Sequence, residues 1–190
     1  MFVNNKNKWL YISTPKGGTH TLYEMLSYFG GSRYGKFHNR VLDHQHKNYF
    51  KFTSVRNPFK RAISVWHSLA FCEPYKSKFG LKETSFRYFS EWLLEKNKNN
   101  YKDTNWSLIR SQKYGYNNIK FDLILQIENL KNDFKKLPFV NKEIKIINPF
   151  TTRKERSKEW FEYYEGNSQE NIYECWKDDF LEYHYENKIS

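Results

Sequence analysis

Short apolar runs alternate with amphipathic stretches along this chain. The runs at 9–14 (WLYIST), 49–55 (YFKFTSV) and 122–127 (DLILQI) are rich in strand formers and predict buried strands. Apolar residues at helical spacing follow each of them. Strands that alternate with helices predict an α/β fold, here a three-layer sandwich with a central, mostly parallel sheet and helices on both faces.

The predicted helices have recognisable starts. The first begins after Thr19, a plausible N-cap, and stops at Gly30-Gly31, while Asn57-Pro58 caps the second. Further helices are predicted over 86–93 and 128–137. The apolar faces of the first two helices consist of Leu22, Met25, Leu26 and Phe29, and of Phe59, Ala62, Ile63 and Trp66.

Length and composition indicate one folded domain. A chain of 190 residues suits a single domain over 1–190, and its 16 Phe, 15 Tyr and 6 Trp supply large buried areas. Cys72 and Cys175 lack C-x-x-C spacing, so we expect two buried free thiols rather than a zinc site or a disulfide scaffold. Because no membrane span or signal peptide is evident, we expect a soluble, cytoplasmic protein.

The positive charge is unevenly distributed. Of the net charge of +11, the first 70 residues carry +9, with 11 Lys or Arg against Glu24 and Asp43. This asymmetry fits a nucleic acid, an acidic polymer or a multiply phosphorylated small molecule. The abundance of Lys, Asn, Ile, Phe and Tyr also resembles the codon bias of an A/T-rich genome, which adds lysines without a binding role.

The segment PKGGTHT (15–21) joins the first strand to the first helix. A glycine turn lets backbone N–H groups point at one anion, the helix dipole adds partial positive charge, and Lys16 adds a full one. The order differs from the ATP-type loop G-x-x-x-x-G-K-[ST], because Lys16 precedes Gly17-Gly18. An ordinary ATPase or kinase is therefore disfavoured, and phosphate chemistry without a metal is favoured. Taken alone, the segment fits a simple tight turn better than a phosphate-binding loop.

A second cluster, SVRNPFKRAISVW (54–66), follows the next strand. Arg56 falls at the strand end, and Arg61 and Ser64 share one face of the helix. A guanidinium with a nearby hydroxyl suits a phosphate. Ligands of parallel sheets bind at the carboxyl ends of strands, where Lys16 and Arg56 both fall.

These segments together resemble the two cofactor signatures of the sulfotransferase family that uses 3′-phosphoadenosine 5′-phosphosulfate (PAPS), in particular its carbohydrate-sulfotransferase-like branch. TPKGGTHTL precedes FTSVRNPFKRAIS, as in that family. The stretches 122–137 (DLILQIENLKNDFKKL) and 159–185 (EWFEYYEGNSQENIYECWKDDFLEYHY) are similar to the branch's E-N-L-x-x-D-F helix and closing helix. The resemblance covers most of the chain and implies a P-loop-NTPase-like fold.

The resemblance also implies a reaction and a set of residues. A sulfuryl group would pass from PAPS to an acceptor hydroxyl by in-line displacement, leaving 3′-phosphoadenosine 5′-phosphate (PAP), with no metal. Lys16 would be catalytic, neutralising charge on the leaving phosphate oxygen. Arg56 and Ser64 would hold the 3′-phosphate, and Arg153 with Lys154 would complete that site. The residues implied in binding the 5′-phosphosulfate are Lys16, Gly17, Gly18, Thr19, His20 and Thr21.

The reaction needs a base for the acceptor proton. The family supplies a His or Glu, often from between the two signatures, and the branch often shows a His about a dozen residues before the second strand. His38 lies 14 residues before Phe52 and is the predicted base. His44, His46 and Glu24 remain alternatives. The H-x-H pair could suggest a metal, but without a third ligand we expect two exposed polar residues.

Two positions depart from the family pattern, and two other function classes remain. His20 replaces a hydroxyl residue, and Gln126 stands where the branch often has Arg. The alternatives are a basic nucleic-acid-binding protein and a P-loop kinase relative. The position of Lys16 and Arg56 at two strand ends counts against the first, and the absence of Gly-Lys-Ser/Thr counts against the second. We expect a hydroxyl-bearing acceptor, a saccharide, held by the loops 70–120 and 140–160, and neither nucleic acid nor membrane as partner.

Overall fold

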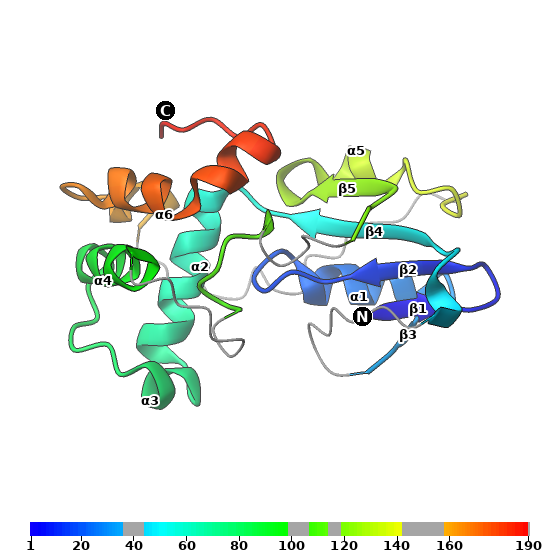
Figure 1. Cartoon of the computed structure of the whole chain (residues 1–190), viewed down its shortest axis with the longest axis horizontal. Coiled ribbons are helices and arrows are strands. Elements are labelled where there is room, and N and C mark those ends of the chain that lie inside the picture. The colour runs from blue at the N-terminus through cyan, green and yellow to red at the C-terminus, as the bar shows by residue number, and fades with distance from the viewer. Residues whose placement is uncertain (36–43, 99–106, 114–118, 142–157, 190) are drawn as a thin grey trace. The chain divides into compact units, whose positions relative to one another are not determined.

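The chain forms two compact units. The computed structural model describes residues 1–35, 44–98, 107–113, 119–141 and 158–189 (Figure 1). Unit 1 comprises Met1–Arg56 and Gly115–Lys154, and unit 2 comprises Asn57–Tyr114 and Glu155–Ser190. The boundary falls directly after the second predicted strand, where the chain passes from the sheet into a helix.

Unit 1 contains a five-stranded sheet in the order β3-β1-β2-β4-β5. The strands β2, β4 and β5 are parallel, as the sequence predicts, whereas β1 pairs antiparallel with both β2 and β3. The sheet is therefore mixed rather than mostly parallel, because β1 and β3, which have three and two residues, add an antiparallel edge. The strands are β1 (Phe2–Asn4), β2 (Trp9–Ile12), β3 (Ser32–Arg33), β4 (Phe50–Val55) and β5 (Leu123–Gln126).

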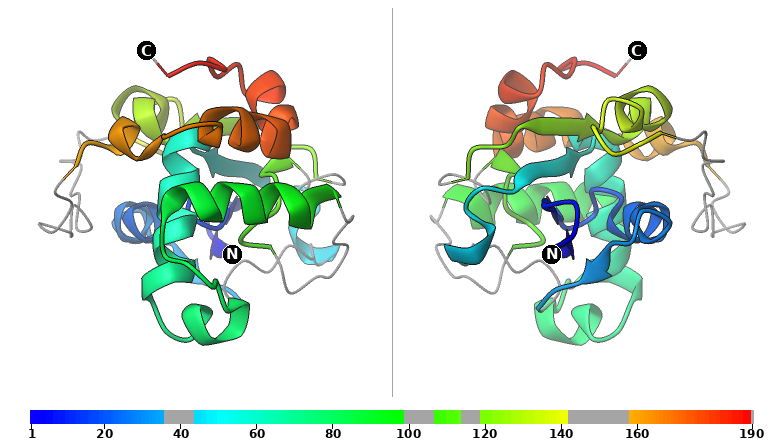
Figure 2. Two further views of the ribbon diagram at one scale, coloured as in Figure 1. Left: turned by 90° about the vertical axis from the view of Figure 1, so that its left-hand side faces the viewer. Right: turned by 90° about the vertical axis from the view of Figure 1, so that its right-hand side faces the viewer.

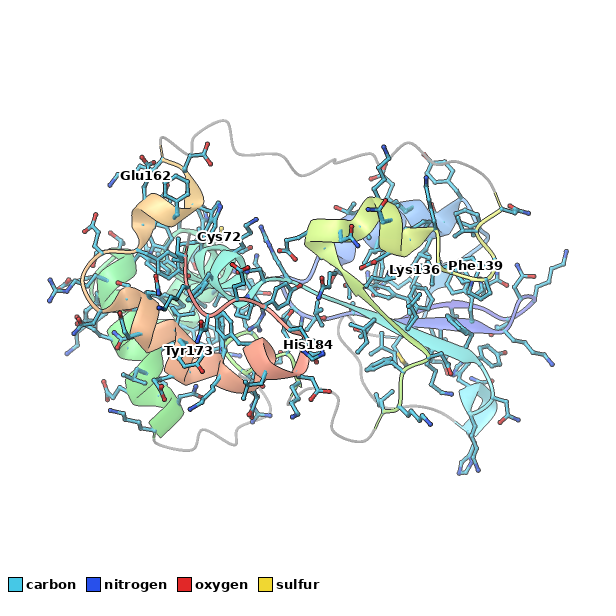
Figure 3. All side chains as sticks on the ribbon, turned by 90° about the horizontal axis from the view of Figure 1, so that it is seen from above. Cys72, Lys136, Phe139, Glu162, Tyr173 and His184 are labelled. Carbon is cyan, nitrogen blue, oxygen red and sulfur yellow. The ribbon has the colours of Figure 1, made fainter. Side chains whose placement is uncertain are left out.

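Two helices cover one face of this sheet. The helices α1 (Thr19–Ser27) and α5 (Leu130–Phe134) share a core with the strands, and both lie on the same side in Figure 2, right. Phe139, labelled in Figure 3, follows α5, and its ring stacks on Trp9 at 4.6 Å between centroids. The opposite face buries Leu10 and Ile12 under residues that belong to no helix. Helices on both faces are thus not confirmed among the described residues of unit 1.

Unit 2 is helical, with its core among α2, α4 and α6 (Figure 2, left). The start of α2 is as predicted, since Pro58 lies in its first turn and the Asn57 side chain accepts a hydrogen bond from the Lys60 N–H at 3.2 Å. All four residues of the predicted apolar face are buried. The elements are α2 (Pro58–Phe71), α3 (Tyr75–Phe79), α4 (Phe86–Lys98), the 3-10 turn η5 (Trp160–Tyr163) and α6 (Ser168–Glu182).

The closing segment 159–185 supplies buried polar contacts to unit 2. The carboxylate of Asp179 accepts hydrogen bonds from the backbone N–H groups of Gln112 and Lys113 at 2.8 and 2.9 Å. Burial raises the pKa of Asp179, and Arg61 and these two donors oppose that shift. Tyr164 donates to a backbone carbonyl of α2 at 2.7 Å. This segment therefore has a structural role in its unit.

The two cysteines differ in exposure. Cys175 on α6 is buried, as predicted, whereas Cys72 at the end of α2 is only half-buried, because it lies where the chain leaves the helix. The two cysteines are not joined in a disulfide. Among the helices that the structure describes, none has the length and apolar character needed to span a bilayer.

Candidate functional site

Residues 15–18 (PKGG), called the glycine loop below, lie between the carboxyl end of β2 and the start of α1. The chain turns sharply here, because Lys16 and Gly18 both adopt left-handed backbone conformations, with φ of +64° and +81°. Between them, the Gly17 N–H donates to the Thr14 carbonyl at 3.1 Å. A left-handed lysine is uncommon. The loop therefore fixes the backbone of Lys16, which is half-buried, in a specific geometry.

The surroundings of both glycines leave little room for a side chain. A Cβ at Gly17 would lie 3.0 Å from the Thr14 side chain and 3.1 Å from the Ser54 carbonyl oxygen. A Cβ at Gly18 would lie 2.3 Å from Cδ1 of Ile127. The loop thus packs closely against the ends of β4 and β5, and no other residue type fits without displacement of its neighbours.

The start of α1 is not capped by a side chain. The N-cap residue is Gly18, not Thr19 as predicted, and glycine has no side chain with which to cap the helix. The Thr19 hydroxyl instead donates to the Thr14 carbonyl at 3.0 Å, which explains why the prediction was wrong. The first N–H groups of a helix have no partner within it and carry partial positive charge. This end of α1 is therefore suited to an anion.

Buried hydroxyl groups of β2 and β4 anchor the loop. The Ser54 hydroxyl donates to the Gly17 carbonyl at 2.5 Å and lies 2.6 Å from the Tyr11 hydroxyl. The Thr14 hydroxyl donates to the Ser54 carbonyl. Sequence reasoning missed Tyr11, Thr14 and Ser54, although polar residues at the ends of two apolar strands could have been the signal.

The turn after β5 also contacts the loop. Its 3-10 turn η4 (Ile127–Asn129) carries the isoleucine that faces Gly18. The buried carboxylate of Asp133 on α5 fixes this turn by accepting from the Gln126 N–H at 2.8 Å and from the Asn129 side chain at 2.9 Å. Lys136, labelled in Figure 3, adds an ion pair at 2.8 Å. The E-N-L-x-x-D-F stretch thus supports the glycine loop.

Among the remaining predicted binding residues, His20 is exposed and Thr21 is half-buried on the first turn of α1. Arg56 is the half-buried last residue of the first segment of unit 1, and Ser64 is a half-buried residue of α2 in unit 2. Arg153 and its neighbour Lys154 lie outside the described residues.

Arg61 is a core residue of unit 2. Its guanidinium is buried in unit 2 and lies 4.3 Å from the centroid of the Trp176 ring. Its Nη2 donates to the carbonyls of Leu108 and Arg110 at 3.1 and 2.9 Å. These contacts belong to the core of the unit. The Arg61 side chain therefore has a structural role, although its spacing from Ser64 is helical as predicted.

The candidate bases occupy different environments. His38 lies outside the described residues, Glu24 is half-buried on α1, and His44 is exposed. His46 is 1% exposed, and its ring lies 4.9 Å from those of Tyr34 and Tyr49. The expectation of two exposed histidines is therefore wrong for His46, because the turn η1 (His44–His46) directs it into the aromatic cluster. The described residues contain no cluster of three side chains able to ligate a metal.

The fold is α/β, and the loop at the carboxyl end of β2 leads into the start of α1, an arrangement suited to an anion. The model of the sulfotransferase family matches residues 1–186, so the chain belongs to the sulfotransferase family. The match spans both units, and the carbohydrate-sulfotransferase-like branch is consistent with it. Neither a search of curated proteins nor one of solved structures finds a match to the chain.

Proposed function

We propose that this protein transfers a sulfuryl group from PAPS to a saccharide hydroxyl, with both units acting as one domain over 1–190. The observation that carries the proposal is the glycine loop, in which Lys16 adjoins an uncapped helix start on a left-handed turn. Membership of the sulfotransferase family supports sulfuryl transfer as the reaction type and favours neither nucleic-acid binding nor a kinase.

The residues present fit the phosphosulfate end of this donor. The two glycines let the loop pack closely against Thr14, Ser54 and Ile127, and the start of α1 adds partial positive charge. Lys16 provides a full charge, and the Thr14 and Ser54 hydroxyls already hold the loop in place. An anionic group can therefore be bound without rearrangement of the loop backbone.

Each residue would have a definable task. Bound PAPS supplies the sulfuryl group together with a bisphosphate leaving group. Lys16 neutralises the charge that develops at the leaving oxygen, and the first N–H groups of α1 orient the 5′ end. Arg56 and Ser64 bind the 3′-phosphate, and Arg153 completes the binding site. His38 accepts the proton of the acceptor hydroxyl.

The role of Lys16 can be tested with a matched lysine. Lys8, exposed in the turn between β1 and β2, also has a positive φ, +50°, so Lys8→Met changes the same residue type in a similar backbone conformation. In a transfer assay with sulfur-labelled PAPS and a saccharide panel, Lys16→Met should lower turnover by about 10²- to 10³-fold, since charge stabilisation at the transition state is lost. Lys8→Met should stay within about twofold of the wild type. Equal turnover of the two variants would contradict the proposal.

The base is tested separately. His38→Ala should retain affinity for PAP in calorimetry and lower turnover by about 10²- to 10⁴-fold, because only the proton acceptor is removed. Should His38→Ala remain fully active while Glu24→Gln or His44→Ala loses turnover, the base is one of those residues instead.

A further inference from the structure

The Tyr11 hydroxyl on β2, the Ser54 hydroxyl on β4 and the Gly17 carbonyl are buried and form one hydrogen-bond network. The Tyr11 and Ser54 hydroxyls are 2.6 Å apart, and Ser54 Oγ lies 2.5 Å from the Gly17 carbonyl oxygen, to which it donates. A serine hydroxyl has one hydrogen. Because that hydrogen is used on Gly17, the Tyr11 hydroxyl must be the donor to Ser54. The hydrogen bonds therefore run from Tyr11 as donor to Ser54, and from Ser54 as donor to the Gly17 carbonyl.

This hydrogen-bond network fixes the orientation of the Gly17–Gly18 peptide. In a trans peptide the C=O and the following N–H point in opposite directions. Since the Gly17 carbonyl is directed at Ser54, the Gly18 N–H is directed away from that hydroxyl. Gly18 is also the N-cap residue of α1, so this N–H adjoins the uncapped first turn.

Glycine makes such a restraint necessary. A Gly-Gly peptide can rotate at little steric cost, because neither residue has a Cβ to oppose a positive or a negative φ. The N–H of Gly17 is held by the Thr14 carbonyl at 3.1 Å, and its carbonyl is held by Ser54. Loss of the Ser54 hydroxyl would leave that carbonyl without its side-chain donor and the peptide free to turn.

We propose that Ser54, oriented by Tyr11, is a positioning residue that directs the Gly18 N–H toward the 5′-phosphosulfate. The inference rests on the proposed function and extends it to two residues that do not touch the donor. Tyr11 acts only through Ser54, which predicts that the effects of changing the two residues are not additive.

The experiment measures affinity by calorimetry, well below the unfolding temperature of each variant, for PAP and for inorganic pyrophosphate. Ser54→Ala should weaken both affinities by about 10-fold and Tyr11→Phe by about threefold, as expected for loss of one hydrogen bond and of its orienting donor. The double variant should match Ser54→Ala. Thr53→Val is the control, because it removes a neighbouring buried hydroxyl that donates to the Ile12 carbonyl at 2.7 Å, outside the loop.

A purely structural role would lower the melting temperature of Ser54→Ala and Thr53→Val but leave both affinities unchanged, and this result would overturn the inference. Additive losses in the double variant would overturn the order Tyr11 to Ser54. If the wild type binds pyrophosphate but not PAP, the proposed function fails, while the pyrophosphate series still decides the role of Ser54. Binding of neither probe by the wild type would overturn both.

Discussion

At the scale of single residues, hydrogen-bonding position matters more than residue type. Thr19, Thr14 and Ser54 all carry hydroxyl groups near the loop, yet each contacts a backbone carbonyl rather than an open surface. Lys16 stands apart because it combines a charge with a left-handed backbone. The three hydroxyl groups thus hold the backbone around the loop, and Lys16 supplies its charge.

Buried Cys175 gives a residue-scale prediction on pH. Burial raises the pKa of its thiol from 9.0 to about 12. The pKa is higher in the folded state than in the unfolded state, so the neutral thiol stabilises the fold fully below pH 9. This stabilisation is lost as pH rises toward 12. Between pH 8 and pH 10 the free energy of unfolding should fall by about 1.4 kcal/mol from this thiol alone.

Urea unfolding of the wild type and of Cys175→Ala at both pH values measures this loss. The substitution creates a cavity and lowers stability at pH 8, but its additional decrease at pH 10 should be smaller than that of the wild type by the amount given. An identical pH dependence in the two proteins would contradict a raised pKa.

At the scale of elements, the loop depends on how β5 and its following turn pack against α1. Ile127 faces Gly18, and the buried Asp133 holds the turn that carries it. The E-N-L-x-x-D-F stretch therefore contributes to the geometry of the glycine loop through packing.

Two glycine substitutions separate packing from backbone strain. Gly18→Ala places a Cβ at 2.3 Å from Ile127 at φ of +81°, whereas Gly80→Ala at φ of +56° meets nothing within 4 Å. Gly80→Ala should cost about 1 kcal/mol for the left-handed conformation, and Gly18→Ala about 2–3 kcal/mol, because the end of the Ile127 side chain must also shift to make room. Thermal unfolding measures both, and equal costs would contradict the close approach of Ile127 to the loop.

Much of the fold at this scale follows from the sequence. The three apolar runs are β2, β4 and β5, and the patterns predict α1, α2, α4 and α5. The strands β1 and β3 are too short to show a pattern, so the mixed sheet could not be predicted. Loop residues were found from their chemistry, but Ser54 was missed because only the folded backbone brings its hydroxyl to Gly17. The burial of His46 likewise depends on ring contacts with Tyr34 and Tyr49, which only the folded structure brings about.

At the scale of the whole molecule, the family match covers both units, while the excess of positive charge falls in the first 70 residues. These residues include the glycine loop and Arg56. A concentrated positive field raises the local concentration of an anionic ligand and makes its binding sensitive to salt. A small bisphosphate nucleotide is consistent with this distribution and with sulfuryl transfer.

The central claim is that the protein binds the phosphosulfate nucleotide, and its most direct test is the melting temperature with PAP and with ATP plus Mg²⁺. At about 100 times its dissociation constant, PAP should stabilise the fold by about 2.7 kcal/mol and raise the melting temperature by about 5–10 °C. ATP with Mg²⁺ should leave it nearly unchanged. A rise with ATP and Mg²⁺ and none with PAP would contradict the account.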